Sequence, residues 1–141
     1  METEQLKLFC KPQKVSFKLQ KIQMTTSKYD LEDRAFNFAA DVRLFCKNLT
    51  KSLINMDDIK QVIRSSGSVG ANYIEANEPL GAKDFKMRLK IARKEAKESR
   101  YWLKLIKISS EIEEVNKIEE LIQEATELNK ILSNIINKAK D

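Results

Sequence analysis

Four polar residues have the side chains and the spacing that an acid/base or metal site requires: Asn72, Glu75, Glu95 and Glu98. The two members of each pair are three residues apart, so on a helix they occupy neighbouring turns of one face. Their oxygen atoms suit Mg²⁺ or Ca²⁺. The same groups can instead fix the register of two packed helices by bonding to an arginine, for which Arg64 and Arg93 are candidates. We favour this structural role and expect neither a metal nor a cofactor.

Histidine is absent from the whole sequence, which removes the commonest general base and metal ligand. A di-iron site in a helical bundle, which uses Glu-x-x-His pairs, is therefore excluded. The two cysteines, Cys10 and Cys46, are far apart in unlike surroundings, and Cys46 falls within an apolar helical pattern. We expect both thiols to be reduced, Cys46 to lie in the core, and the protein not to be an enzyme.

Basic residues recur at steps of four and three between residues 86 and 107: Lys86, Lys90, Arg93, Lys97, Arg100, Lys104 and Lys107. On a helix they form one basic stripe about 32 Å long, which can run along the phosphates of a nucleic acid. The alternative is a solvated flank that faces an acidic fourth helix. Its expected partners there are Glu113, Glu120, Glu124 and Glu127.

Aromatic residues do not alternate with the basic stripe, apart from Tyr101 beside Arg100. Platforms that stack single-stranded bases need such alternation, so base-specific readout is not supported. We expect Tyr101 and Trp102 to be packing residues, with their polar tips at a bundle edge or a subunit contact.

Helices must position all of these residues, because apolar residues recur at steps of three and four from residue 30 onward. The expected helices span residues 30–53, 58–76, 82–109 and 113–139, with turns at 55–57 and 77–81. Their apolar seams are Ala35, Phe38, Val42, Phe45 and Leu49; Ile59, Val62, Ser66, Val69, Tyr73 and Ala76; Phe85, Leu89, Ala92, Ala96, Ser99, Leu103 and Ile106; and Ile118, Leu121, Ala125, Leu128, Leu132, Ile135 and Ala139. Four helices with short turns predict an all-α, antiparallel up-down four-helix bundle.

The second expected helix contains an unusual run of small residues. An internal glycine costs a helix about 1 kcal/mol relative to alanine, so the small side chains must serve the close approach of a neighbouring helix. We assign close helix packing to Ser68, Gly70 and Ala71.

Residues 1–29 differ from the bundle domain assigned to residues 30–141. They carry six lysines against two glutamates and alternate in a way that suits an extended segment. This basic arm is either a pairing segment, a disordered segment, or a translated leader ahead of an internal start at Met24. No apolar run is long enough to cross a bilayer and no signal peptide is present, so we expect a cytoplasmic protein with no membrane partner.

Two blocks of sequence carry a family resemblance. Residues 64–76 read Arg-Ser-Ser-Gly-Ser-Val-Gly-Ala-Asn-Tyr-Ile-Glu-Ala, and residues 84–103 contain Asp-Phe, Ile-Ala, Lys-Glu-Ala and Tyr-Trp-Leu. Over residues 30–139 the chain resembles the bacterial four-helix bundle family that includes proteins encoded in intervening sequences of 23S rRNA genes, sometimes labelled ribosomal-protein-like. The third-helix signature of that family falls on Lys94, Glu95, Ala96, Glu98, Tyr101, Trp102 and Leu103. Where relatives often have a capping serine, this chain has Ala82.

The resemblance implies an antiparallel bundle that forms a ring, typically a homopentamer, without established enzymatic activity. A related branch, similar in fold, assists the reverse transcriptase of diversity-generating retroelements. Our leading hypothesis is a non-catalytic homo-oligomer that binds RNA or a ribonucleoprotein through the basic stripe. The alternative is a structural or protein-interaction module, for example an accessory factor of a reverse transcriptase.

Overall fold

The computed structural model describes residues 29–139 of the chain. This part contains four α-helices and no strand: α2 (Tyr29–Lys47), α3 (Asn55–Asn77), α4 (Ala82–Ser109) and α5 (Val115–Lys138). The chain divides into two compact units, Met1–Arg34 and Ala35–Asp141, and the bundle described below is the second. The expected arm at residues 1–29 lies outside the described residues apart from Tyr29.

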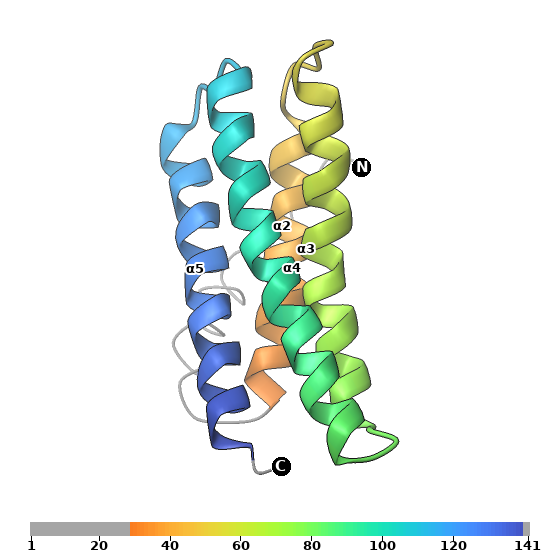
Figure 1. The fold of residues 1–141 in the computed structure, drawn as a ribbon. Helices are drawn as coiled ribbons and strands as arrows, with labels where there is room; N and C mark the ends of the chain where they lie inside the picture. Colours follow the sequence, from red (N-terminus) through yellow and green to blue (C-terminus); the bar gives the residue numbers. More distant parts are fainter. Residues whose placement is uncertain (1–28, 140–141) are drawn as a thin grey trace, which may run out of the picture. The chain divides into compact units, whose positions relative to one another are not determined.

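Within the unit from Ala35 onward, successive helices run in opposite directions (Figure 1). The orange α2 and the green-to-teal α4 run one way, and α3 and the blue α5 run the other. Short connections between them permit only antiparallel neighbours. The predicted all-α, antiparallel up-down four-helix bundle is confirmed.

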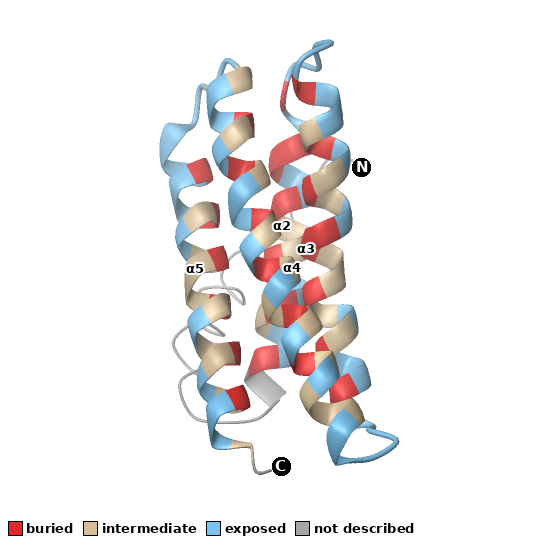
Figure 2. Cartoon of the chain, in the orientation of Figure 1, coloured by how far each residue is buried: buried red, intermediate tan, exposed pale blue. Residues whose placement is uncertain are grey.

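The core consists of one row of small and apolar residues from each helix, which Figure 2 shows as red positions facing the interior. Nearly every residue of the four predicted seams is buried. Phe85, Ile135 and Ala139 are only half-buried, and Ile136 is buried in place of Ile135. The last step on α5 is therefore four residues, because a helix of 3.6 residues per turn drifts away from a strict heptad.

The predicted boundary between the first two helices is wrong. The first helix ends at Lys47, six residues earlier than predicted, and α3 begins at Asn55, inside the predicted turn. The Ser52 backbone N–H donates to Asn55 Oδ1 at 2.7 Å, and the Asn55 N–H donates to Ser52 Oγ at 3.2 Å. This reciprocal pair closes the turn before α3 in the pattern of a capping box and satisfies N–H groups that a helix start leaves free. The helix begins at Asn55, three residues before the predicted Asp58, with Ile54 at its N-cap position.

Asn55 is buried and also links two loops at one end of the bundle. Its amide nitrogen donates to the Thr50 carbonyl and to Ser110 Oγ, both at 3.0 Å. Nearby, Ser109 Oγ donates to the Asp58 carboxylate at 3.2 Å. The connection between α2 and α3 is thereby held against the end of α4.

The helix α4 has its predicted limits although Ala82 offers no side-chain cap. The Asp84 carboxylate instead accepts a hydrogen bond from the Leu80 N–H at 3.2 Å in the preceding turn. The following helix begins at Val115 rather than at Glu113. No helix in the described part of the chain has the length and the apolar character needed to cross a membrane.

Candidate nucleic-acid interface

The basic stripe lies one residue after each core position of α4. Leu89, Ala92, Ala96, Ser99, Leu103 and Ile106 are buried, so the residue following each is rotated by about 100° toward one side. Five members of the stripe are exposed: Lys90, Lys97, Arg100, Lys104 and Lys107. Lys86 and Arg93 are half-buried, and Lys86 makes an interaction of its own. The structure thus brings most of the stripe to the surface of α4.

One flank of α5 faces the stripe, and it is mostly uncharged. Asn129 Nδ2 donates to the Arg93 carbonyl at 3.2 Å, and Lys107 pairs with Glu119. Asn129 and Glu119 each follow a buried residue of α5, Leu128 and Ile118 respectively. On the same flank, at steps of three and four, stand Ile122, Thr126 and Ser133. Only Glu119 brings a negative charge to this flank.

The acids expected to neutralise the stripe lie elsewhere. Glu120, Glu124 and Glu127 each precede a buried residue of α5, so they occupy the opposite flank of that helix, and Glu113 lies before its start. Gln123 donates to Glu127 at 2.9 Å, and Glu124 has an interaction of its own. None of the ion pairs found among residues 29–139 joins these four acids to the stripe. The expected pairing is replaced by the single contact to Glu119.

Four positive charges of the stripe consequently stand without an acidic partner in the described structure: Lys90, Lys97, Arg100 and Lys104. They extend over about 21 Å of helix at 1.5 Å per residue. Lys94 is also exposed on this helix and has no ion pair there. Lys94 is not part of the basic stripe predicted from the sequence. Its spacing of seven residues from Tyr101 places both residues on one face of α4.

A shallow, open hollow lies on the outer face of α4 beside the stripe. Its lining residues are Lys94, Lys97, Glu98, Tyr101 and Trp102. Tyr101 is 57% exposed, whereas Trp102 is half-buried. The two rings meet edge to face, with centroids 5.1 Å apart and planes at 71°. Trp102 is half-buried, as a packing residue should be, but its indole nitrogen is buried without an acceptor among the described residues. Residues 29–139 leave Tyr101 exposed.

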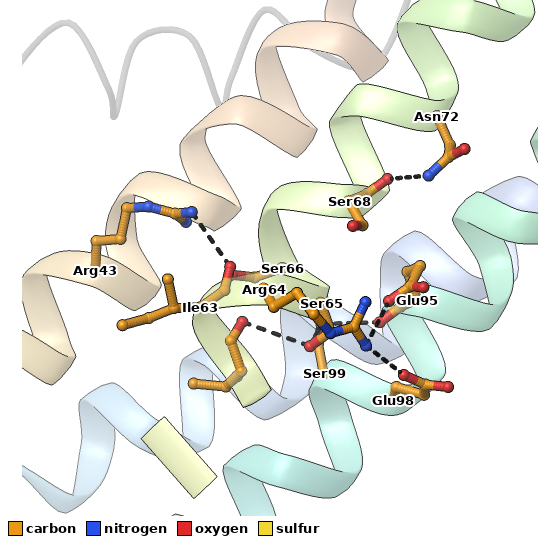
Figure 3. A network of polar contacts seen from close by, with 11 residues as sticks. Arg43, Ile63, Arg64, Ser65, Ser66, Ser68, Asn72, Glu95, Glu98 and Ser99 are labelled. Carbon is orange, nitrogen blue, oxygen red and sulfur yellow. Dashed lines mark hydrogen bonds and ion pairs between the residues drawn. The ribbon is translucent and has the colours of Figure 1, made fainter. Parts of the chain in front are cut away.

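The polar quartet is split by the fold, and Figure 3 shows three of its members, Asn72, Glu95 and Glu98. Glu95 and Glu98 share Arg64 of α3, whose Nη2 lies 3.4 Å and 3.0 Å from their carboxylates. Asn72 donates to the Ser68 carbonyl of its own helix at 2.8 Å, and Glu75 is exposed. The four side chains do not converge on one point. In the described part of the chain, no group of three or more His, Cys, Asp or Glu residues could hold a metal ion.

Two serines continue this cross-helix network into the core (Figure 3). Ser99 Oγ of α4 lies 2.9 Å from Ser65 Oγ of α3 and 2.8 Å from the Glu95 carbonyl, and its single O–H donates to one of them at a time. Both serines are fully buried. Ser65 was missed in the sequence because it precedes the core position Ser66, yet hydroxyl groups on facing helices bond readily when both are small enough to approach.

Close packing of small residues is found on one side of α3 only. A Cβ atom added to Gly70 would lie 3.4 Å from Ala35 Cβ of α2, and one added to Gly67 would lie 3.0 Å from Arg43 Nη2. The same Arg43 nitrogen donates to the Ile63 carbonyl at 3.2 Å (Figure 3). Ser68 is half-buried, but Ala71 is exposed. Close packing at Ala71 is therefore not found among residues 29–139, because that residue is exposed there.

Cys46 is a free, buried thiol, as expected, and Cys10 lies outside the described residues. Burial raises the pKa of the Cys46 thiol to about 11, against smaller opposing effects of Lys51 and Arg43. The thiol is therefore protonated and unreactive at neutral pH, since the thiolate is the nucleophile. It offers no catalytic nucleophile.

Comparison with known proteins identifies a family. The sequence profile of the family described as 23S rRNA-intervening sequence protein matches residues 27–134. The chain is also similar to the crystal structure of a protein with unknown function from the S23 ribosomal protein family of Bacteroides thetaiotaomicron. The two chains are 34% identical, the match covers 75% of this chain and 97% of the other, and the TM-score is 0.64. Among curated proteins, no match is found.

Proposed function

Because the chain belongs to the 23S rRNA-intervening sequence protein family, we propose that it binds RNA through the basic stripe of α4. The observation that carries the proposal is the set of exposed, unneutralised charges at Lys90, Lys97, Arg100 and Lys104. A row of cations held on a rigid helix contacts successive phosphates and releases their counterions. The family name refers to an intervening sequence of 23S rRNA, and RNA is therefore the polyanion chosen for the test.

The charge distribution favours polyanion binding by this row of cations over a solvated helix flank without a ligand. Residues 83–107 carry ten lysines and arginines against three acids, a net charge of +7 (10 minus 3). Two of those acids, Glu95 and Glu98, are already engaged by Arg64 on the other flank of the helix. The local field at the stripe is therefore strongly positive, which steers a polyanion toward α4.

The proposed role is binding without catalysis, in the cytoplasm and as a homo-oligomer. The candidate acids are tied to Arg64 or exposed singly. Self-association is supported by large apolar side chains at the surface, such as Phe36, which is 70% exposed, and Leu44 and Met87. Three further large apolar residues outside the four seams, Ile91, Trp102 and Leu105, are half-buried. Light scattering at micromolar concentration should give several times 16 kDa, with five subunits as the expected number.

A protein-interaction module is the second candidate, and the same exposed apolar residues favour it. In that case the surface of Phe36 and Leu44 would receive another protein, such as a reverse transcriptase, and the stripe would remain solvated. Salt dependence separates the two functions, because an apolar contact strengthens or is unchanged as salt rises whereas phosphate contacts weaken.

The test replaces Lys90, Lys97, Arg100 and Lys104 by Gln together. Gln has nearly the same helical propensity as Lys and Arg, so the circular dichroism spectrum should be unchanged. The affinity for a single-stranded RNA of mixed sequence is then measured across a salt series. Four phosphate contacts contribute a log–log slope of about −3 for a single strand, and the fourfold variant should lose that part of the slope.

Two further variants make the result specific. The first changes the exposed lysines Lys47, Lys51, Lys60 and Lys130 to Gln, which removes the same charge from other parts of the bundle. The second changes four lysines of the arm: Lys7, Lys11, Lys14 and Lys18. Retention of the wild-type slope by the folded stripe variant contradicts the proposal, and loss of binding in the arm variant alone assigns the contact to the arm.

A further inference from the structure

Tyr101 is an exposed aromatic ring inside the basic surface. It lies on the outer face of α4, four residues after Lys97 and three residues before Lys104, so the two lysines bracket it one turn away on either side. The residue is 57% exposed. A ring that the described residues leave exposed, with a lysine on each side that has no ion pair among them, has the composition of a base-stacking position on a phosphate-binding surface.

The surroundings of Tyr101 hold its ring in place and leave it on a positively charged surface. The edge of the ring meets Trp102, with the centroids 5.1 Å apart, and Trp102 is half-buried against the bundle. Glu98 is the one acid that lines the hollow, and it shares Arg64 with Glu95, at 3.0 Å and 3.4 Å. The two carboxylates and Arg64 together keep one negative charge, which Lys94 and Lys97 on the same hollow outnumber.

We propose that this hollow receives one unpaired base, stacked on the Tyr101 ring, with the adjoining phosphates on Lys97 and Lys104. The proposal rests on the RNA-binding function above and deepens it by naming the class of RNA, which is single-stranded. In a duplex each base is stacked between its neighbours, so a duplex can reach the lysines but not the ring.

Charge complementarity selects RNA over a second copy of the chain as the occupant of the hollow. A second copy seated on Tyr101 would bury Lys94, Lys97 and Lys104 in the same contact, and burying unpaired cations is costly. A polyanion compensates all three of them. The aromatic ring adds contact that does not depend on base identity, because every base has a π-face.

The test compares Tyr101→Leu with the wild-type protein on two probes, an oligouridylate and a blunt RNA duplex of equal length. We expect Tyr101→Leu to bind the oligouridylate roughly 5- to 100-fold more weakly, and the duplex unchanged. Tyr101→Phe should keep both affinities, since the ring remains. The control is Leu80→Ala, which removes an exposed apolar side chain from the turn before α4 and should leave both affinities unchanged.

Trp102 supplies an independent readout because it is the sole tryptophan of the chain. A base stacked on Tyr101 lies next to the indole, so the oligouridylate should change Trp102 fluorescence in the wild type and not in Tyr101→Leu. Wild-type affinity of a folded Tyr101→Leu for the oligouridylate overturns the stacking proposal. If the fourfold stripe variant loses RNA binding in the same series, the RNA-binding function stands without the stacking proposal.

A change in the mass of the oligomer on Tyr101→Leu assigns the ring to a subunit contact and also overturns the proposal. Failure of the wild-type protein to bind either probe removes the RNA-binding function itself. These two outcomes are distinguished by light scattering and by the wild-type titration, so the two proposals fail separately.

Discussion

The buried amide of Asn55 offers the sharpest test of how the bundle end is held. Its side chain makes three hydrogen bonds, to the Ser52 N–H, the Thr50 carbonyl and Ser110 Oγ, and the residue is only 1% exposed. An intramolecular hydrogen bond contributes about 1 kcal/mol net, so three contribute about 3 kcal/mol. Ser52 and Thr50 are exposed, and water can replace part of what they lose. We therefore expect Asn55→Ala to cost about 2 kcal/mol.

This loss is measured as a shift in the urea midpoint at fixed protein concentration, with the m-value checked for constancy. In a thermal scan it corresponds to roughly 8 °C for a domain of this size. Asn134→Ala on the exposed side of α5 is the matched control. It should change the midpoint little, because alanine is the better helix former.

A double-mutant cycle isolates the contact between the two loops. Ser110→Ala should cost about 1 kcal/mol in the wild type and almost nothing in the Asn55→Ala background, because the same hydrogen bond is then already absent. An equal cost of Ser110→Ala in both backgrounds would refute the link. An unchanged midpoint for Asn55→Ala would show that the capping box does not set the start of α3.

Two further perturbations test the packing of α2 against α3 and the burial of the thiol. Gly70→Leu should cost on the order of 1–3 kcal/mol by overpacking, because even a Cβ there lies 3.4 Å from Ala35 Cβ. Ala71→Leu enlarges a side chain at an exposed position and should be tolerated. Equal urea midpoints of the two variants would contradict the close contact at Gly70. Cys46 should resist iodoacetamide at neutral pH in a Cys10→Ser variant and react once urea unfolds the chain. Because burial raises its pKa from 9.0 to about 11, the neutral thiol is favoured by folding, so its stabilising contribution is complete below pH 9 and is lost as the pH rises toward 11. A constant urea midpoint between pH 8 and pH 10.5 relative to Cys46→Ala would contradict the raised pKa.

The packing seams could be predicted from the sequence because they depend only on spacing. Phe38, Val42 and Leu103 fall on steps of three and four, and any helical arrangement that buries them must face them inward. The helix start at Asn55 was not recognised in the sequence. Residues 55–57 were predicted as a turn and the helix from Asp58, because the Ser52–Asn55 pair has Asn at the position where a capping box usually has Glu or Gln.

The surroundings of the basic stripe could not be predicted from the sequence, because they depend on which flank of α5 faces α4. Glu120 and Glu119 are neighbours in the sequence, but they point to opposite flanks of α5. Which of them faces α4 is decided by the rotation of α5 about its axis, and packing of Leu121, Leu128 and their partners fixes that rotation. Exposure of Tyr101 is set in the same way, since a one-residue difference separates it from the half-buried Trp102.

Repulsion between the like charges of the stripe also destabilises α4, and this leads to a last prediction. At spacings of three and four residues, Lys90, Lys97, Arg100 and Lys104 have basic neighbours and no acidic one. Like-charge pairs at these spacings destabilise a helix by about 0.2–0.5 kcal/mol each. The fourfold change to Gln should therefore stabilise the protein by on the order of 1–2 kcal/mol at low salt, and the gain should shrink as salt screens the charges.

Urea titration of the fourfold variant and of the wild type at two salt concentrations measures this gain. The variant with Lys47, Lys51, Lys60 and Lys130 changed to Gln is the control, because these lysines are dispersed over the bundle and repel one another less. A fourfold stripe variant less stable than the wild type at low salt would mean that the stripe has partners that stabilise the fold. A more stable variant that no longer binds RNA would show that α4 keeps its charges for binding and at the expense of stability.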